Sequence, residues 1–285
     1  MKICLTGGTG FIGSRVKSFF EHKGFIVENV TRADIKSSVE SWKHKLDGAE
    51  MLINLAGAPI YKRWTPAYKK EILNSRIETT LKLLEAFKQI ENKPSLVLSA
   101  SAVGIYDEYE IHDEFSDHFG TGFLADVCKQ WEASIASIAT ETTRLAILRI
   151  GVVLDSGGGA LAKMLPSFKM GMGAVIGSGE QAFPCIHISD FLSAIWFLYQ
   201  NEESSGIFNM VAPDIVSNKY FSKKLGEVLH RPVLLKIPQS LLKLGLGDGA
   251  VVLTNGQKVK PNRLIKLGFS YQFPSVNSIL EDILK

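Results

Sequence analysis

A glycine-rich turn near the start of the chain constrains its fold more than any other feature. The apolar run Met1-Lys2-Ile3-Cys4-Leu5-Thr6 leads into Gly7-Gly8-Thr9-Gly10-Phe11-Ile12-Gly13, and residues 14–23 have a helical pattern. The glycines fit both G-x-G-x-x-G and G-x-x-G-x-x-G. Because glycine has no side chain, a diphosphate can approach the backbone of such a turn and meet free N–H groups at the helix start. The strand–turn–helix context predicts a dinucleotide-binding turn rather than a turn without a ligand.

The composition is that of an ordinary globular protein. The chain has 285 residues, of which 46% are hydrophobic and 21% charged, and its formal net charge is +3. Scattered basic residues argue against a nucleic-acid partner, and no apolar stretch approaches the ~18 residues of a membrane span. Three widely separated cysteines predict neither a disulfide framework nor a metal site. Because Met1 runs directly into the first strand, we expect no signal peptide and a cytoplasmic location.

Strand-like and helical segments alternate through the first half of the chain. Apolar runs at residues 25–30, 51–55, 96–100 and 145–150 read as strands, and residues 66–89 and 122–139 read as helices. This alternation predicts an α/β fold with a doubly wound parallel sheet of the Rossmann type. Ligands of such sheets bind at the carboxyl ends of the strands, so functional residues are expected there.

A change in character near Asp155 indicates a second structural unit. Residues 156–159 form a glycine-rich break, and further glycines follow up to Gly179. We expect residues 1–155 to form the coenzyme-binding domain, rejoined by residues 182–212 through a strand at 185–188 and a helix at 190–199. Residues 156–181 and 213–285 are expected to form a smaller, mostly helical lobe on the substrate side.

The end of the second strand indicates which nicotinamide coenzyme would bind. Enzymes that use NAD usually carry Asp or Glu about 20 residues beyond the glycines, where it binds the ribose 2′-hydroxyl. This chain has Thr31 and Arg32 there instead. A carboxylate would repel the 2′-phosphate of NADP, whereas these two residues could bind it, so NADP is predicted. In the alternative interpretation, Arg32 is a surface charge and Asp34 approaches the ribose.

Several stretches resemble the extended short-chain dehydrogenase/reductases, which include the NAD-dependent epimerases and dehydratases of nucleotide sugars. They are Thr6–Gly13, Asn54–Gly57, Leu98–Val103 and Ile186–Asp190. The chain more closely resembles an atypical branch known only as epimerase family proteins. The stretches similar to that branch are Arg63–Thr65, Ser75–Ile77, Leu148–Leu154, Gly158–Leu161 and Gly177–Gln181. The tail, with Gly256–Val259, Pro261 and Gly268-Phe269, resembles its C-terminal domain of unknown function.

The resemblance implies a catalytic serine, tyrosine and lysine, but only the serine is matched. Ser101 stands at the serine position and would polarise the substrate oxygen. The Tyr-x-x-x-Lys motif is absent, because either Leu124 and Cys128 or Phe123 and Val127 occupy its two positions. A general acid contributes roughly 10²- to 10⁴-fold to such a reaction, so the proton donor is unassigned and turnover itself is open.

Two further residues are catalytic candidates. Arg76 lies where the family carries an active-site asparagine, and it could bind a carboxylate or phosphate in a bidentate manner. The alternative is a helix-surface ion pair with Glu71 or Glu78. His187 lies in a segment that the family places near the nicotinamide, although a histidine there is also a common structural residue.

The leading function is therefore that of an NADP-binding oxidoreductase acting on an unidentified small substrate, which could carry an anionic group for Arg76 to bind. The alternatives are a coenzyme-binding regulator or scaffold without turnover, and a nucleotide-sugar epimerase. The resemblance also implies a homodimer through the helices at 66–89 and 122–139. The coenzyme-binding candidates are Gly7, Thr9, Gly10, Phe11, Ile12, Gly13, Thr31, Arg32, Leu55, Ala56, Gly57 and Arg149.

Overall fold

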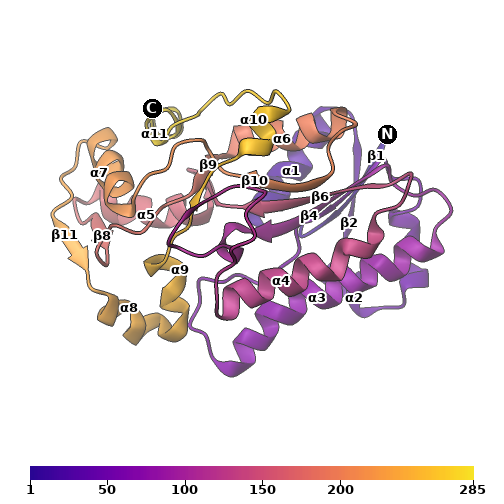
Figure 1. Ribbon diagram of the computed structural model, residues 1–285, viewed down its shortest axis with the longest axis horizontal. Helices are drawn as coiled ribbons and strands as arrows, with labels where there is room; N and C mark the ends of the chain where they lie inside the picture. Colours follow the sequence, from indigo (N-terminus) through magenta and orange to yellow (C-terminus); the bar gives the residue numbers. More distant parts are fainter.

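A parallel six-stranded sheet forms the centre of the molecule in the computed structural model, which describes residues 1–285 (Figure 1). The strand order is β10-β6-β4-β3-β1-β2, and every neighbouring pair runs parallel. Strand β2 is added on one side of β1, and β3 is then added on the other side. The order of the strands therefore reverses between β1 and β3, and such a switch point is where folds of this kind bind ligands. The strands are β1 (Lys2–Thr6), β2 (Ile26–Val30), β3 (Met51–Asn54), β4 (Leu96–Ala102), β6 (Arg144–Ile150) and β10 (Gly206–Met210).

Helices cover both faces of the sheet because successive strand residues point to opposite sides. Ile3 and Leu5 pack in a core with α1 (Phe11–His22) and α6 (Ile188–Gln200), whereas Cys4 packs in a second core with α3 (Pro66–Gln89) and α4 (Phe123–Ile135). The sheet is therefore buried on both sides, as a parallel sheet requires.

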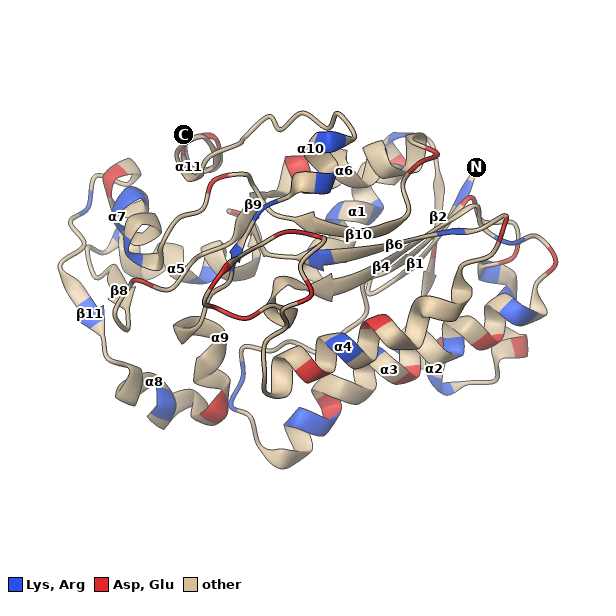
Figure 2. Ribbon diagram, viewed as in Figure 1, with Lys and Arg blue, Asp and Glu red and all other residues tan.

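Local signals set the start of the longest helix. The Thr65 hydroxyl accepts a hydrogen bond from the Tyr68 N–H, and Pro66 occupies the first turn, where its missing N–H is not needed. At 24 residues α3 is too polar to span a bilayer, and the other helices are too short. Figure 2 shows basic and acidic residues interspersed along α3, α4 and the surrounding loops.

A third hydrophobic core lies in the region that follows β6. It joins Leu161 and Phe168 of α5 (Gly159–Lys169), Phe221 of α7 (Asn218–Val228) and Ile279 of α11 (Val276–Leu284). Helices predominate in this region beyond β10. The remaining elements are α2 (Arg32–Lys36), β5 (Ile111–His112), β7 (Val152–Asp155), α5 (Gly159–Lys169), β8 (Ala174–Ile176), β9 (Cys185–His187), α7 (Asn218–Val228), β11 (Leu235–Ile237), α8 (Gln239–Leu246), α9 (Val251–Thr254), β12 (Lys258–Val259), α10 (Asn262–Lys266) and α11 (Val276–Leu284).

The structure differs from the sequence-based expectation in the pairing of one strand. The strand expected at 185–188 is present as β9, but it pairs with β7 in a separate two-stranded sheet. The element that completes the six-stranded sheet is β10, which the sequence analysis did not predict. The helix expected at 122–139 ends at Ile135 and continues as a 3-10 turn over Ala136–Ile138.

Candidate functional site

The glycine turn after β1 has a shape that only glycines allow. Gly7 has a φ of +73°, and a Cβ on it would lie 2.7 Å from the Leu55 carbonyl oxygen. A Cβ on Gly13 would lie 2.1 Å from the Gly7 oxygen. Helix α1 begins at Phe11 with no side-chain cap and no acidic residue in its first turn. Its first N–H groups are therefore free to bind an anion, which is the requirement for a diphosphate cradle.

A chain of buried hydrogen bonds brings the ends of three strands together beneath this turn. The Thr6 hydroxyl donates to Asn54 Oδ1 (2.7 Å), and the Asn54 amide donates to Thr80 Oγ1 (3.2 Å) and Ser99 Oγ (3.4 Å). The Ala56 N–H donates to Thr6 Oγ1. These bonds place Leu55, Ala56 and Gly57 beside the glycine turn, at the switch point of the sheet.

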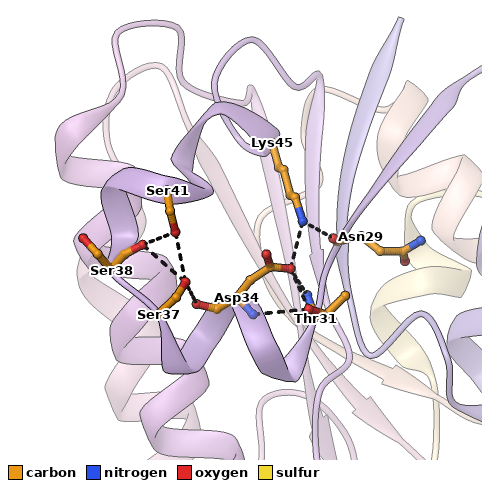
Figure 3. Close-up of polar contacts among 7 residues, drawn as sticks. All are labelled: Asn29, Thr31, Asp34, Ser37, Ser38, Ser41 and Lys45. Carbon is orange, nitrogen blue, oxygen red and sulfur yellow. Dashed lines mark hydrogen bonds and ion pairs between the residues drawn. The ribbon is translucent and has the colours of Figure 1, made fainter.

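Asp34, which in the alternative interpretation approaches the ribose, makes several hydrogen bonds within the protein (Figure 3). Asp34 Oδ2 accepts hydrogen bonds from the Thr31 N–H (2.6 Å), the Thr31 hydroxyl (2.7 Å) and Lys45 Nζ (2.8 Å). Burial alone would raise the pKa of Asp34, but the bonds from Lys45 and Thr31 outweigh it and lower that pKa. The negative charge at this position is therefore compensated within the protein.

Thr31 and Asp34 form a capping box at the start of α2. Arg32, the next residue after Thr31, has an exposed side chain. Both Arg32 and Lys45 thus place positive charge at the end of β2. Lys45 was not among the residues predicted from the sequence, because it lies in a short 3-10 helix and reaches Asp34 only in the folded chain. Only its positive charge could have suggested it, and many lysines share that property.

The hydroxyl of Ser101 points to a buried ion pair. It donates to Glu132 Oε1 at 2.6 Å, while Arg149 holds the same carboxylate through Nε (2.9 Å) and Nη2 (2.8 Å). The third contact of Arg149 is the Tyr106 hydroxyl at 2.7 Å. Donation from Ser101 to a substrate oxygen would therefore require its bond to Glu132 to break. The contacts of Arg149 are those of a structural ion pair, and its predicted role with the coenzyme stays a prediction.

Arg76 projects from α3 toward the loop after β3. Its guanidinium donates to the carbonyl oxygens of Ile72 (2.8 Å) and Ala58 (3.2 Å), and it lies over the Trp131 ring at 5.1 Å. A Cβ on Gly57 would lie 2.9 Å from the guanidinium carbon, so the glycine provides space for it. Neither Glu71 nor Glu78 pairs with Arg76, so the ion-pair alternative does not describe this structure.

The two positions of the missing Tyr-x-x-x-Lys motif carry apolar or poorly ionising groups. Cys128 is buried, and burial raises the pKa of its thiol to about 11. Leu124 belongs to an apolar cluster around Trp64. Lys129, the nearest lysine, donates to the Gly120 carbonyl at 3.0 Å. We find no phenol–ammonium pair at these positions of α4.

His187 makes contacts typical of a helix cap. Its Nδ1 accepts the Ser189 N–H (3.0 Å) at the start of α6, and its Nε2 lies 3.2 Å from Asp282 Oδ2 of α11. Burial lowers the pKa of this histidine, and the nearby carboxylates Asp282 and Asp190 only partly offset that effect. These contacts account for the residue structurally, and its catalytic role stays a prediction.

Comparison with known proteins agrees with this architecture. Residues 3–210 match the profile of the NAD dependent epimerase/dehydratase family, and residues 237–283 match a domain of unknown function, DUF1731. The chain belongs to the NAD dependent epimerase/dehydratase family. It is 38% identical to the chloroplastic epimerase family protein SDR39U1 homolog of Arabidopsis thaliana, over all of this chain and 87% of that protein. An epimerase family protein of Staphylococcus haemolyticus is 34% identical, with 98% of each chain covered.

A solved structure matches over its whole length. The human epimerase family protein SDR39U1 (isoform 2), crystallised with NADPH, superposes with a TM-score of 0.92 and 31% identity. The match covers 100% of this chain and 99% of the human one. The human protein and this chain therefore share the Rossmann-type fold and the helical C-terminal region described above.

Proposed function

We propose that this chain is an NADP-dependent oxidoreductase. The observation that carries the proposal is the compensated charge at the end of β2, where Lys45 and Thr31 bind Asp34 and Arg32 stays exposed. An uncompensated carboxylate at this place would repel the 2′-phosphate of NADP. The NADPH in the human family member supports the same coenzyme.

The residues that would hold NADP come from the ends of three adjacent strands. The diphosphate would bind the glycine turn and the start of α1, and Arg32 with Thr31 would bind the 2′-phosphate. Leu55, Ala56 and Gly57 would line the path of the coenzyme between the diphosphate site and the 2′-phosphate site. When bound, the reduced coenzyme supplies a hydride for a carbonyl group. Ser101, Arg76 and His187 are the proposed catalytic residues on the substrate side.

A catalytic test follows from the absent Tyr-x-x-x-Lys motif. We expect NADPH oxidation with some members of a panel of aldehydes, ketones and keto acids, and we expect Ser101→Ala to reduce the rate without weakening NADPH binding. The loss of the rate measures what the Ser101 hydroxyl, which hydrogen-bonds Glu132, contributes to the reaction. NADPH oxidation that is unchanged in Ser101→Ala would contradict the proposed role of this residue.

A second candidate function is coenzyme binding without turnover. Leu124 and Cys128 in the place of the family's tyrosine and lysine favour it, as does the engagement of Ser101 with Glu132. Under this alternative, Ser101→Ala and Arg76→Ala leave the cellular phenotype intact, whereas Gly10→Asp abolishes it by blocking the diphosphate. A nucleotide-sugar epimerase would instead retain its sugar nucleotide and a tightly bound coenzyme through purification.

A further inference from the structure

The guanidinium of Arg76 has the properties of a binding site without its ligand. An arginine has five N–H bonds, and two of those on Arg76 reach acceptors, the carbonyls of Ile72 and Ala58. The Nε atom has no partner, yet it is not among the buried polar atoms that lack one, so it faces accessible space. A ligand could therefore reach the free donors of this guanidinium.

No carboxylate balances the charge of Arg76. Burial lowers the pKa of this arginine, and the other ionisable groups that act on it are Cys128 and Tyr68 rather than an acid. Arg149 provides the internal comparison, because its buried guanidinium is held by both oxygens of Glu132. A largely buried positive charge without a counter-ion destabilises the folded state. Binding of an anionic ligand would compensate that charge.

The surroundings of Arg76 are apolar and partly exposed. Ile72, whose carbonyl accepts one of its bonds, is buried in a small cluster with Trp64 and Val127. More members of this cluster are partly exposed than buried, so it presents an apolar surface instead of a closed core. The partly exposed members are Ile60, Tyr68, Leu73, Phe123, Leu124, Val251 and Val252.

We infer that Arg76 binds the oxyanion, a carboxylate or a phosphate, of a substrate whose body is apolar and packs on the Trp64 cluster. The guanidinium is oriented by two backbone carbonyls and by the Trp131 ring, which prepares its free edge for bidentate pairing. The glycine at position 57 leaves the space that the guanidinium occupies. The contribution of α9 through Val251 and Val252 gives the C-terminal region a part in substrate selection.

This inference rests on the proposed function in one respect, since the substrate would bind next to NADP. The same oxyanion chemistry could also come from a phosphate of the coenzyme, because Gly57 belongs to the stretch that would line the coenzyme path. The experiment therefore has to measure the two ligands separately. Benzoate and phenyl phosphate are suitable probes because each joins an oxyanion to an apolar ring, and benzamide is the uncharged control.

The test titrates the full-length protein with NADPH and then titrates the NADPH complex with each probe. We expect benzoate or phenyl phosphate to bind the wild type, and benzamide to bind more weakly. Arg76→Gln should weaken the charged probe roughly 10- to 100-fold and leave NADPH affinity unchanged. Arg76→Lys should retain part of the affinity. Lys88→Gln is the matched control, since it removes an exposed positive charge from the same helix.

The outcomes separate this inference from the proposed function. If NADPH binds but neither charged probe binds the wild type, the substrate site is wrong and the coenzyme proposal stands. If Arg76→Gln weakens NADPH and not the probes, the oxyanion belongs to the coenzyme and the inference is overturned. The inference would also be overturned if Arg76→Lys and Arg76→Gln both fold and bind the charged probes as tightly as the wild type does. If NADPH does not bind the wild type, the proposed function itself fails.

Discussion

Lys45 Nζ lies 2.8 Å from Asp34 Oδ2, and this pair sets the charge at the end of β2 (Figure 3). The same lysine donates to the carbonyl of Asn29, the residue before Val30 at the strand end. Lys45 is thus fixed by two contacts beside the place where the adenosine ribose binds in this fold. We therefore propose that a lysine distant from the glycine turn in sequence takes part in the choice between NAD and NADP.

Replacing Lys45 should change coenzyme preference. In Lys45→Met the Asp34 carboxylate loses its counter-charge, so we expect the ratio of NADPH to NADH affinity to fall roughly tenfold. Lys43→Met is the control, because Lys43 pairs with Glu40 at 2.7 Å on the same segment and does not contact Asp34. Fluorescence titration measures both affinities. An unchanged ratio in Lys45→Met would show that Asp34 has no influence on the coenzyme.

The capping box of α2 should make part of the stability depend on pH. The pKa of Asp34 lies below its ordinary value of 3.8 because the bonds from Lys45 and Thr31 outweigh the effect of burial. A carboxyl whose folded pKa is lowered stabilises the fold above its unfolded pKa, and that contribution is lost as the pH falls through the folded pKa. Asp34→Asn should therefore be less stable than the wild type at pH 7. Urea unfolding should show the difference vanishing at acid pH, whereas a difference that persists there would assign the loss to shape instead of charge.

Removing the charge of Glu132 should destabilise the fold strongly. Glu132→Gln leaves the buried guanidinium of Arg149 without a carboxylate and Ser101 without a charged acceptor. Loss of one partner from a buried ion pair costs about 3–5 kcal/mol of unfolding free energy. Chemical denaturation measures this loss, and Glu132→Gln/Arg149→Met should recover part of it. A loss below about 1 kcal/mol would mean that the pair behaves like a surface ion pair.

His187 offers a test of structure against catalysis. His187→Ala removes the acceptor for the Ser189 N–H at the start of α6, and the loss of such a cap costs roughly 1 kcal/mol. We expect that loss in thermal unfolding, together with unchanged NADPH affinity. His187→Asn can still cap the helix and should restore most of the stability. A large fall in the rate of NADPH oxidation for a fully stable His187→Asn would support the catalytic prediction instead.

Local sequence signals predicted much of the fold. The helix over residues 66–89 was predicted with both of its ends from its helical pattern, and in the structure Thr65 and Pro66 mark its start. The glycine turn was recognisable because its need for bare backbone is local, as the contacts of Gly7 and Gly13 confirm. The pairing of strands was harder to predict from the sequence. The pairing of β9 with β7 joins residues such as Val152 and Cys185, which only the folded chain brings together.

The candidate site shows the same division. Arg32 and Thr31 stand next to the strand that presents them, so their place followed from the motif. The partners of Asp34 and Ser101 could not be predicted in this way, because Lys45 reaches Asp34 from a separate 3-10 helix and Glu132 reaches Ser101 from α4. The missing carboxylate beside Arg76 is likewise a property of three-dimensional packing. Sequence spacing allowed ion pairs with Glu71 or Glu78 that the structure does not form.

The most direct measurement of the central claim is a titration of wild type and Arg32→Ala with NADPH and with NADH. Arg32 is exposed and has no hydrogen-bond or ion-pair partner, so its removal should leave the fold intact. We predict that the wild type binds NADPH more tightly than NADH, and that Arg32→Ala loses roughly tenfold in NADPH affinity while NADH affinity stays the same. Failure of the wild type to bind either coenzyme would contradict the proposed oxidoreductase function.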